Sequence, residues 1–169
     1  MADESQLLDL QTFDFARPLA GIEEIRAANP HRHEFEMLTG IVRVDPSRKV
    51  IVGFKELRAD DFWTRGHMPG FPLFPGVLMC EAAAQLCGYY YTTQKIGDPC
   101  SLLGLAGVDE ARFVRTVRPG ERLVMQATGL KVHRRLTRFR VVGQVGAEKA
   151  FEAVITGVPL GKLEELRGA

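Results

Sequence analysis

The segment from Gly76 to about Lys95 constrains the fold of this chain most, because it reads as a long helix that is apolar on nearly every side. A helix without a polar face is a buried helix, whereas a surface helix keeps one polar face. Between Pro75 and Gly88 the one acidic or basic side chain is Glu81. Burying an unpaired carboxylate is costly unless the group is neutralised or hydrogen-bonded. We therefore expect the helix at the centre of the core and a functional role for Glu81.

Segments with the composition of strands flank this helix in the sequence. A short helix is expected over Gly21 to Ala28, and residues 36 to 45 and 49 to 56 are expected to form a hairpin around Asp45-Pro46-Ser47. Asp60 to Pro75 is expected to be a loop. The strands expected after the helix cover Ser101 to Val108, Phe113 to Val117, Leu123 to Arg134, Thr137 to Val145 and Lys149 to Val158.

This order predicts an α+β fold in which a curved antiparallel sheet wraps around the central helix. One sheet covers only part of a helix, so the remaining apolar side predicts a second subunit, most simply in a homodimer. The three tyrosines Tyr89, Tyr90 and Tyr91 end the helix, and they are expected either to line a tunnel or to pack at the dimer interface.

Length and composition indicate one domain with a substantial core, since the chain has 169 residues of which 46% are hydrophobic. We divide it into an N-terminal extension, residues 1–18, and a single domain, residues 19–169. The net charge of +1 gives no global preference for nucleic acid or a membrane surface. An acidic N-terminus without a signal-peptide pattern favours a cytoplasmic location. The three cysteines, Cys80, Cys87 and Cys100, are expected to be reduced and to serve as small core residues.

A histidine precedes the central helix in a loop stiffened by three prolines. His67 lies before Pro69, Pro72 and Pro75, fourteen residues ahead of Glu81. Imidazole titrates near neutral pH, and a carboxyl group in a dry pocket can keep its proton at that pH. Either residue alone is more often structural than catalytic. Together they indicate general acid/base chemistry.

Several motifs in one order resemble the (3R)-hydroxyacyl-[acyl-carrier-protein] dehydratases of type II fatty acid synthesis, which have the hotdog fold. The similarity extends over roughly Asn29 to Leu160. The motifs are Pro30-His31-Arg32, the stretch from Gly66-His67 through Phe74-Pro75-Gly76 to Glu81 and Gln85, Gly107-Val108-Asp109-Glu110-Ala111-Arg112-Phe113, Val117-Arg118-Pro119-Gly120, and Leu136-Thr137-Arg138-Phe139.

This resemblance implies dehydration of a (3R)-hydroxyacyl thioester to a trans-2-enoyl thioester. His67 would remove the C2 proton, and Glu81 would deliver a proton to the departing 3-hydroxyl group. The backbone N–H of Gly76 would bind the thioester carbonyl, and Gln85, one helical turn beyond Glu81, would orient that carboxyl group. In the family, the histidine and the glutamate of one site come from different subunits.

The resemblance also implies a substrate carried on the phosphopantetheine of acyl carrier protein, with no other cofactor and no metal. His31 and His33 form a poor metal-ligand pattern without carboxylate or thiolate companions. The assembly would be a homodimer or a trimer of dimers. Members of a related group that also isomerise the double bond have aspartate in the position of Glu81, so isomerisation is not expected.

A basic stretch offers a docking surface for an acidic carrier protein. Between Lys131 and Arg140 there are five basic residues and no acidic one. The residues expected to dock the carrier protein are Arg112, Lys131, Arg134, Arg135 and Arg138. The alternative is a solvated hairpin whose alternate side chains face water. Complementary charge would mainly raise the rate of encounter.

Two rival functions remain at the level of sequence. One is a hotdog acyl thioesterase, which would use an acid and a water on the same scaffold. The other is a non-catalytic acyl-binding subunit of a hetero-oligomer. The chain also departs from the family after Arg32, where His33 to Gly40 is more polar than usual and lacks an Asp-Arg pair. This departure leaves the packing of the first strand open.

Overall fold

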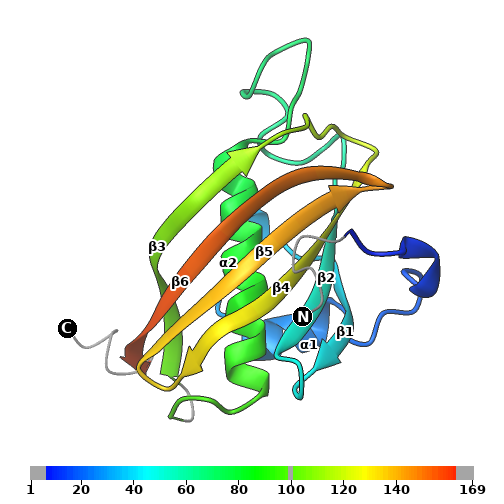
Figure 1. The fold of residues 1–169 in the computed structure, drawn as a ribbon. Coiled ribbons are helices and arrows are strands. Elements are labelled where there is room, and N and C mark those ends of the chain that lie inside the picture. Colours follow the sequence, from blue (N-terminus) through cyan, green and yellow to red (C-terminus); the bar gives the residue numbers. More distant parts are fainter. Residues whose placement is uncertain (1–6, 99–100, 163–169) are drawn as a thin grey trace.

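The computed structural model describes residues 7–98 and 101–162. Its six strands form one antiparallel sheet in the order β1-β2-β4-β5-β6-β3, and the helix α2 runs along one face of that sheet (Figure 1). The elements are α1 (Ile22–Ala28), β1 (Gly40–Asp45), β2 (Val50–Glu56), α2 (Gly76–Thr93), β3 (Ser101–Phe113), β4 (Arg122–His133), β5 (Leu136–Val145) and β6 (Glu148–Lys162), with short 3₁₀ helices at Leu10–Thr12 and His33–Phe35. This is the α+β architecture expected from the sequence.

The helix α2 is buried as its composition predicts. Its apolar side chains join the inner faces of the strands in one core cluster. β2 approaches α2 so closely that a Cβ atom on Gly53 would lie 2.7 Å from the Leu86 side chain and 3.2 Å from the carbonyl oxygen of Gly40. A glycine at this point lets the sheet curve around the helix.

The three tyrosines at the end of α2 are also part of the protomer's own core. Tyr90 packs edge-on against Phe139 of β5, and the Tyr91 hydroxyl donates to the carbonyl of Arg134 at 3.0 Å. Tyr89, Tyr90 and Tyr91 are all buried within one chain. The expected packing at a dimer interface is therefore wrong.

One expected break in the sheet is absent. Ser101 to Val108 and Phe113 to Val117 were expected as separate strands, whereas β3 runs without interruption from Ser101 to Phe113. The register against β6 shifts between Asp109 and Arg112, where Glu110 has a φ of 53°. This bulge accommodates the polar residues that resemble a turn in the sequence.

The hairpin of β1 and β2 starts later than expected, at Gly40 rather than residue 36. Before it, Glu36 pairs with Arg26 at 2.6 Å, while Met37 and Leu38 enter the core. The segment that departs from the family pattern is thus firmly packed. Met37 and Leu38 contribute to the core without forming a strand, whereas His33, Glu34 and Phe35 are exposed.

Residues 7–18 lie against the outer face of the sheet, away from α2. Leu8, Leu10, Phe13 and Phe15 pack on a second cluster formed by Val50, Val52, Phe54 and Val124. Gln144 holds this segment through both ends of its amide, since it accepts from the Leu8 N–H at 2.7 Å and donates to the Leu8 carbonyl at 3.0 Å. The segment therefore covers apolar surface that strands β2 and β4 would otherwise expose.

Cys80 and Cys87 are free and buried, as expected, whereas Cys100 lies outside the described residues. Burial raises the pKa of both thiols. They therefore act as core residues. Among the helices that the structure describes, none is long and apolar enough to cross a membrane.

Candidate active site

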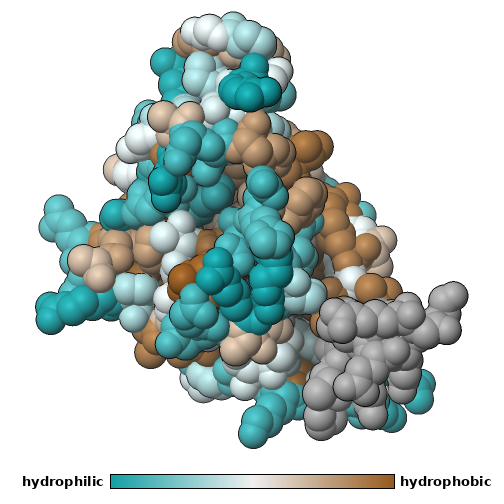
Figure 2. All heavy atoms as spheres, turned by 180° about the vertical axis from the view of Figure 1, so that it is seen from behind, coloured by the Kyte–Doolittle hydropathy of each residue, from teal (hydrophilic) through white to brown (hydrophobic). Residues whose placement is uncertain are grey.

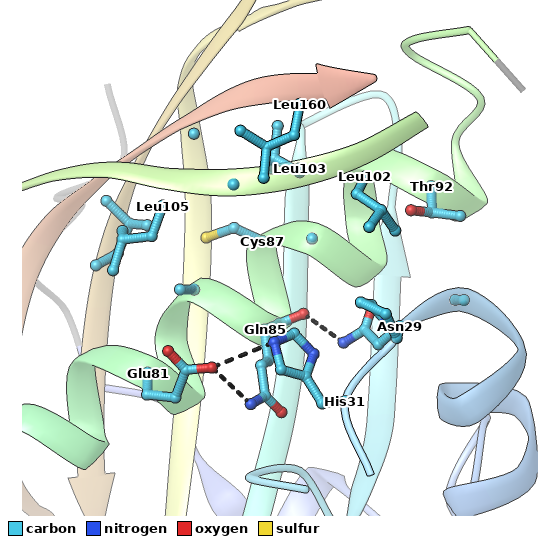
Figure 3. Close-up of a pocket in the computed structure, with 17 residues that line it drawn as sticks. Asn29, His31, Glu81, Gln85, Cys87, Thr92, Leu102, Leu103, Leu105 and Leu160 are labelled. Atoms are coloured by element: carbon cyan, nitrogen blue, oxygen red, sulfur yellow. Dashed lines mark hydrogen bonds and ion pairs between the residues drawn. The ribbon is translucent and has the colours of Figure 1, made fainter. Parts of the chain in front are cut away.

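Glu81 lies in the second turn of α2, where Gln85 binds it from the next turn. The Gln85 Nε2 group donates to Glu81 Oε1 at 2.8 Å and to the Phe35 carbonyl at 2.7 Å, while Gln85 Oε1 accepts from the Met37 N–H at 3.0 Å. A backbone N–H can only donate and a carbonyl can only accept, so these partners fix the orientation of the Gln85 amide. The hydrogen bond expected between Gln85 and Glu81 is thus present (Figure 3).

A second side chain contacts Glu81 that sequence analysis left without a role. Nε2 of His31 lies 3.3 Å from Glu81 Oε1. Burial lowers the pKa of His31, an effect that Glu81 opposes and Arg32 reinforces. The motif Pro30-His31-Arg32 was visible in the sequence, but nothing in its spacing places this imidazole against a residue fifty positions later.

A cavity of about 240 Å³ opens beside these residues. Its walls near Glu81 are polar, with His31, Gln85 and Asn29 (Figure 3). Its other walls come mainly from apolar side chains of β3 and β6, namely Leu102, Leu103, Leu105, Ile155 and Leu160. The cavity suits a ligand with a polar group at one end and an aliphatic chain at the other.

His67 does not line this cavity. It belongs to the loop between β2 and α2, which extends beyond the start of α2 (Figure 1). Its Nδ1 lies 2.7 Å from the carbonyl oxygen of Leu73. Since a carbonyl accepts only, Nδ1 carries the proton, and in a neutral imidazole Nε2 then has the free lone pair. This is the tautomer that a general base using Nε2 requires.

The loop that carries His67 is anchored in the core. Trp63 is buried against Phe74 with ring centroids 5.3 Å apart, and the Trp63 carbonyl accepts from the His67 N–H at 2.8 Å. Met68 and Gly70 then take positive φ values of 66° and 82°. At the other end of the loop, the buried Lys55 lies 3.9 Å from Asp61. These contacts give a long loop a defined shape.

Gly76 begins α2, with its N–H among the amides that the helix itself leaves unpaired. A Cβ atom on Gly76 would lie 3.0 Å from the ring of Phe113. Phe113 is 48% exposed, and Val77 beside Gly76 is 75% exposed. The start of the helix is therefore bordered by uncovered apolar side chains.

These side chains belong to a larger apolar surface. β3 is an edge strand of the described sheet, and Figure 2 shows apolar side chains on the side of the molecule where β3 lies. The exposed apolar residues of β3 and of the segments around the helix start are Met68, Phe71, Val77, Leu105, Val108, Phe113 and Val114. Edge strands and apolar patches of this kind mark surfaces that bind another chain.

Two of the basic residues expected to dock a carrier protein already pair with acidic residues of the same chain. Arg138 lies 3.4 Å from Asp109, and Arg112 lies 3.9 Å from Glu152. Lys131, Arg134 and Arg135 are exposed at and near the tip of the hairpin between β4 and β5. The sheet thus brings acidic residues of β3 and β6 next to Arg138 and Arg112.

The sequence of this chain matches a known protein family and several curated proteins. Residues 29–154 match the model of the FabA-like domain. Curated 3-hydroxyacyl-[acyl-carrier-protein] dehydratases FabZ from Erwinia tasmaniensis and Escherichia coli are each 38% identical over 136 residues, which span 79% of this chain and 89% of theirs.

Solved structures share the fold at lower identity. The dehydratase heterocomplex ApeI:P from Xenorhabdus doucetiae aligns over 85% of this chain and 95% of that chain with a TM-score of 0.67 and 16% identity. The virulence protein Cj0977 from Campylobacter jejuni aligns over 88% and 99% with a TM-score of 0.59 and 18% identity. These likenesses establish the hotdog fold.

Proposed function

The chain belongs to the FabA-like domain family, and we propose that it dehydrates (3R)-hydroxyacyl thioesters on acyl carrier protein to trans-2-enoyl thioesters in fatty acid biosynthesis. The observation that carries this proposal is the carboxyl group of Glu81 at the polar end of an otherwise largely apolar cavity. Such a cavity accepts an acyl chain and presents one proton donor to it. The relatives at 38% identity are named as dehydratases of 3-hydroxyacyl-[acyl-carrier-protein], which supports this proposal.

In the proposed reaction Nε2 of His67 takes a proton from C2, and the electron pair of that C–H bond forms the C2=C3 double bond. The C3–O bond breaks, and the hydroxyl group leaves as water with the proton from Glu81. The charges balance because His67 ends protonated and Glu81 ends as a carboxylate. A water-mediated transfer between the two would restore both. The elimination itself needs no redox cofactor and no metal.

The N–H of Gly76 would stabilise the thioester oxygen while negative charge develops on it during loss of the C2 proton. Oriented amides at the start of a helix suit this role because the helix dipole adds to their partial positive charge. A side chain on Gly76 would contact the ring of Phe113. Its absence leaves space beside the Gly76 N–H through which the thioester would approach.

The proposed site is shared between two subunits of a homodimer. Two observations support this arrangement: His67 does not line the cavity that holds Glu81, and its loop borders the apolar surface beside β3. Pairing of that surface with a second copy would cover both the edge strand and the helix start. Whether dimers assemble further, as in a trimer of dimers, depends on contacts outside this surface.

Acyl carrier protein is the proposed partner, delivering the substrate on its phosphopantetheine arm. The exposed Lys131, Arg134 and Arg135 would attract its acidic surface, whereas Arg112 and Arg138 are partly occupied by acidic neighbours within the chain. We place this reaction in the cytoplasm, a reducing compartment in which the free thiols of Cys80 and Cys87 would persist.

Turnover of 3-hydroxyacyl thioesters on carrier protein tests the proposal, with enoyl formation followed by ultraviolet absorbance and products identified by mass spectrometry. The expected product is the trans-2-enoyl thioester without movement of the double bond. A free acid would instead identify a thioesterase. A folded homo-oligomer that turns over neither short nor long chains would contradict an enzymatic role for this chain alone.

A further inference from the structure

We propose that His31 is a positioning residue for Glu81, donating from Nε2 to Oε1 so that the acidic proton is held on Oε2. This inference rests on the proposed function of Glu81 as the acid. It concerns a residue outside the acid/base pair itself. His31 would act through Glu81 rather than on the substrate.

The first step is the state of Glu81 Oε1. The Gln85 amide is fixed by Phe35 and Met37, so its NH₂ group must donate to Oε1. In a carboxylic acid the carbonyl oxygen is the better acceptor, and the proton lies on the other oxygen. Figure 3 shows that other oxygen directed away from Gln85 and His31. The proton of Glu81 is therefore presented on the side that its two neighbours leave open.

The second step is the state of His31. Since Oε1 is an acceptor, its contact of 3.3 Å with His31 Nε2 is favourable when Nε2 carries a proton directed toward it. His31 Nδ1 is buried and has no hydrogen-bond partner within the described residues. Protonating Nδ1 as well would bury an N–H group without an acceptor, which is unfavourable. Burial also lowers the pKa of His31. His31 is thus a neutral donor.

The third step is how the chain places this imidazole. Asn29 Nδ2 donates to the Gln85 carbonyl at 3.0 Å, which ties the segment to α2. The Arg32 guanidinium donates to the carbonyls of Asn29 at 2.8 Å, of His31 at 2.6 Å and of Arg26 at 3.0 Å. These hydrogen bonds hold the segment Pro30-His31-Arg32, which is extended at Arg32, in a defined conformation. Its guanidinium faces its own backbone, and its imidazole faces Glu81.

The consequence concerns the transition state. As Glu81 gives up its proton, negative charge develops on the carboxyl group, and N–H donors already aimed at Oε1 stabilise that charge without rearrangement. A donor that strengthens as charge develops raises kcat more than it changes substrate binding. Replacing His31 should therefore lower kcat and leave KM nearly unchanged.

Two replacements of His31 test this role by steady-state kinetics. His31→Leu removes the donor, and we expect kcat to fall roughly 10- to 100-fold with little change in KM. His31→Gln returns an N–H group at a similar reach and should recover most of the loss. His33→Asn, which removes a nearby exposed imidazole at a position with a φ of 58°, is the matched control and should keep wild-type activity. Thermal melting checks that each variant folds.

An unchanged kcat in His31→Leu would overturn the inference while leaving the dehydratase function intact. A His31→Gln variant as slow as His31→Leu, with both folded, would also overturn it. Absence of dehydration in the wild type would instead reject the proposed function, and with it any catalytic consequence of His31.

Long-range ¹H–¹⁵N spectra of the histidine side chains supply a measurement that does not depend on turnover. The signals of His31 are assigned by their absence in His31→Gln. Near pH 7 we expect a neutral ring protonated at Nε2. A neutral ring protonated at Nδ1, or a cationic ring, would overturn the inference even if the enzyme is active.

Discussion

The carbonyl oxygen of Leu73 lies 2.7 Å from Nδ1 of His67, six residues earlier in the same loop. This contact selects the tautomer of the proposed base, so the backbone of the loop takes part in the chemistry. The shape of the loop in turn depends on Gly70, whose φ of 82° is one that glycine adopts without strain. The geometry of the loop and the tautomer of the proposed base are thereby coupled.

Gly70→Val should disturb this coupling. A β-branched residue is strained at positive φ, so the loop should shift and kcat should fall roughly 10-fold or more because the base is misplaced. Gly66→Ala is the matched control, since Gly66 has open space around its Cα and no positive φ. Kinetics of both variants check this prediction. Equal activity in the two would show that the shape of the loop does not position His67.

Asp61→Asn should destabilise the protein more than Asp60→Asn does. Lys55 is buried 3.9 Å from Asp61, and burial lowers its pKa while the Asp61 carboxylate partly restores it. Removing the charge of Asp61 leaves a buried amine unpaired, which should cost roughly 1 to 3 kcal/mol in the free energy of unfolding. Asp60 pairs with Arg58 on the exposed surface, so its replacement should change the free energy of unfolding little. Urea unfolding measures both.

Stability should fall between about pH 7.5 and pH 5.5 because of His31. Burial lowers its pKa from 6.5, so below that pH the unfolded chain binds a proton that the folded protein resists. The loss should reach up to about 1 kcal/mol and should shrink in His31→Gln. Hydrogen bonds from Arg26 and Arg115 lower the pKa values of Glu36 and Glu121. The stability that these two carboxylates contribute is therefore lost only below pH 4.5, their ordinary pKa. Unfolding at both pH values tests this; an identical loss in His31→Gln would contradict it.

Gln144→Ala should release the N-terminal segment from the sheet. The Gln144 amide makes two hydrogen bonds with the backbone of Leu8 and a third with the carbonyl of Gly146, and the variant retains none of them. We expect faster proteolytic cleavage within residues 7–18 and a loss of roughly 1 to 2 kcal/mol in the free energy of unfolding. Gln94→Ala, at the C-cap that follows α2, is the control. Wild-type cleavage in Gln144→Ala would show that apolar contacts alone hold the segment.

Much of the fold could be predicted because α2 has an unusual composition. A helix without a polar face fixes its own burial, and Glu81 then stands out as the one charge to be explained. The strand β3 was harder, because a bulge at Glu110 is invisible in a pattern that alternates from residue to residue. Tyr89 to Tyr91 were misplaced because amphipathic rings suit an interface and a core equally.

The site was predictable only where residues lie close in sequence. Gln85 is one turn from Glu81, so helix geometry alone brings them together. His31 reaches Glu81 through a segment held by Arg32, and the acidic neighbour of Arg138, Asp109, comes from another strand. Such contacts depend on the three-dimensional path of the chain, which local patterns do not contain.

The central claim is that His67 of one subunit and Glu81 of another complete one dehydratase site, and mixing two inactive variants tests it most directly. His67→Ala and Glu81→Ala are each expected to lose activity by ~10²-fold or more. After unfolding and refolding together in equal amounts, about half of the dimers are mixed, and each mixed dimer has one intact site. Activity should therefore return to about a quarter of the wild-type value. A refolded mixture that stays as inactive as the separate variants would contradict a shared site.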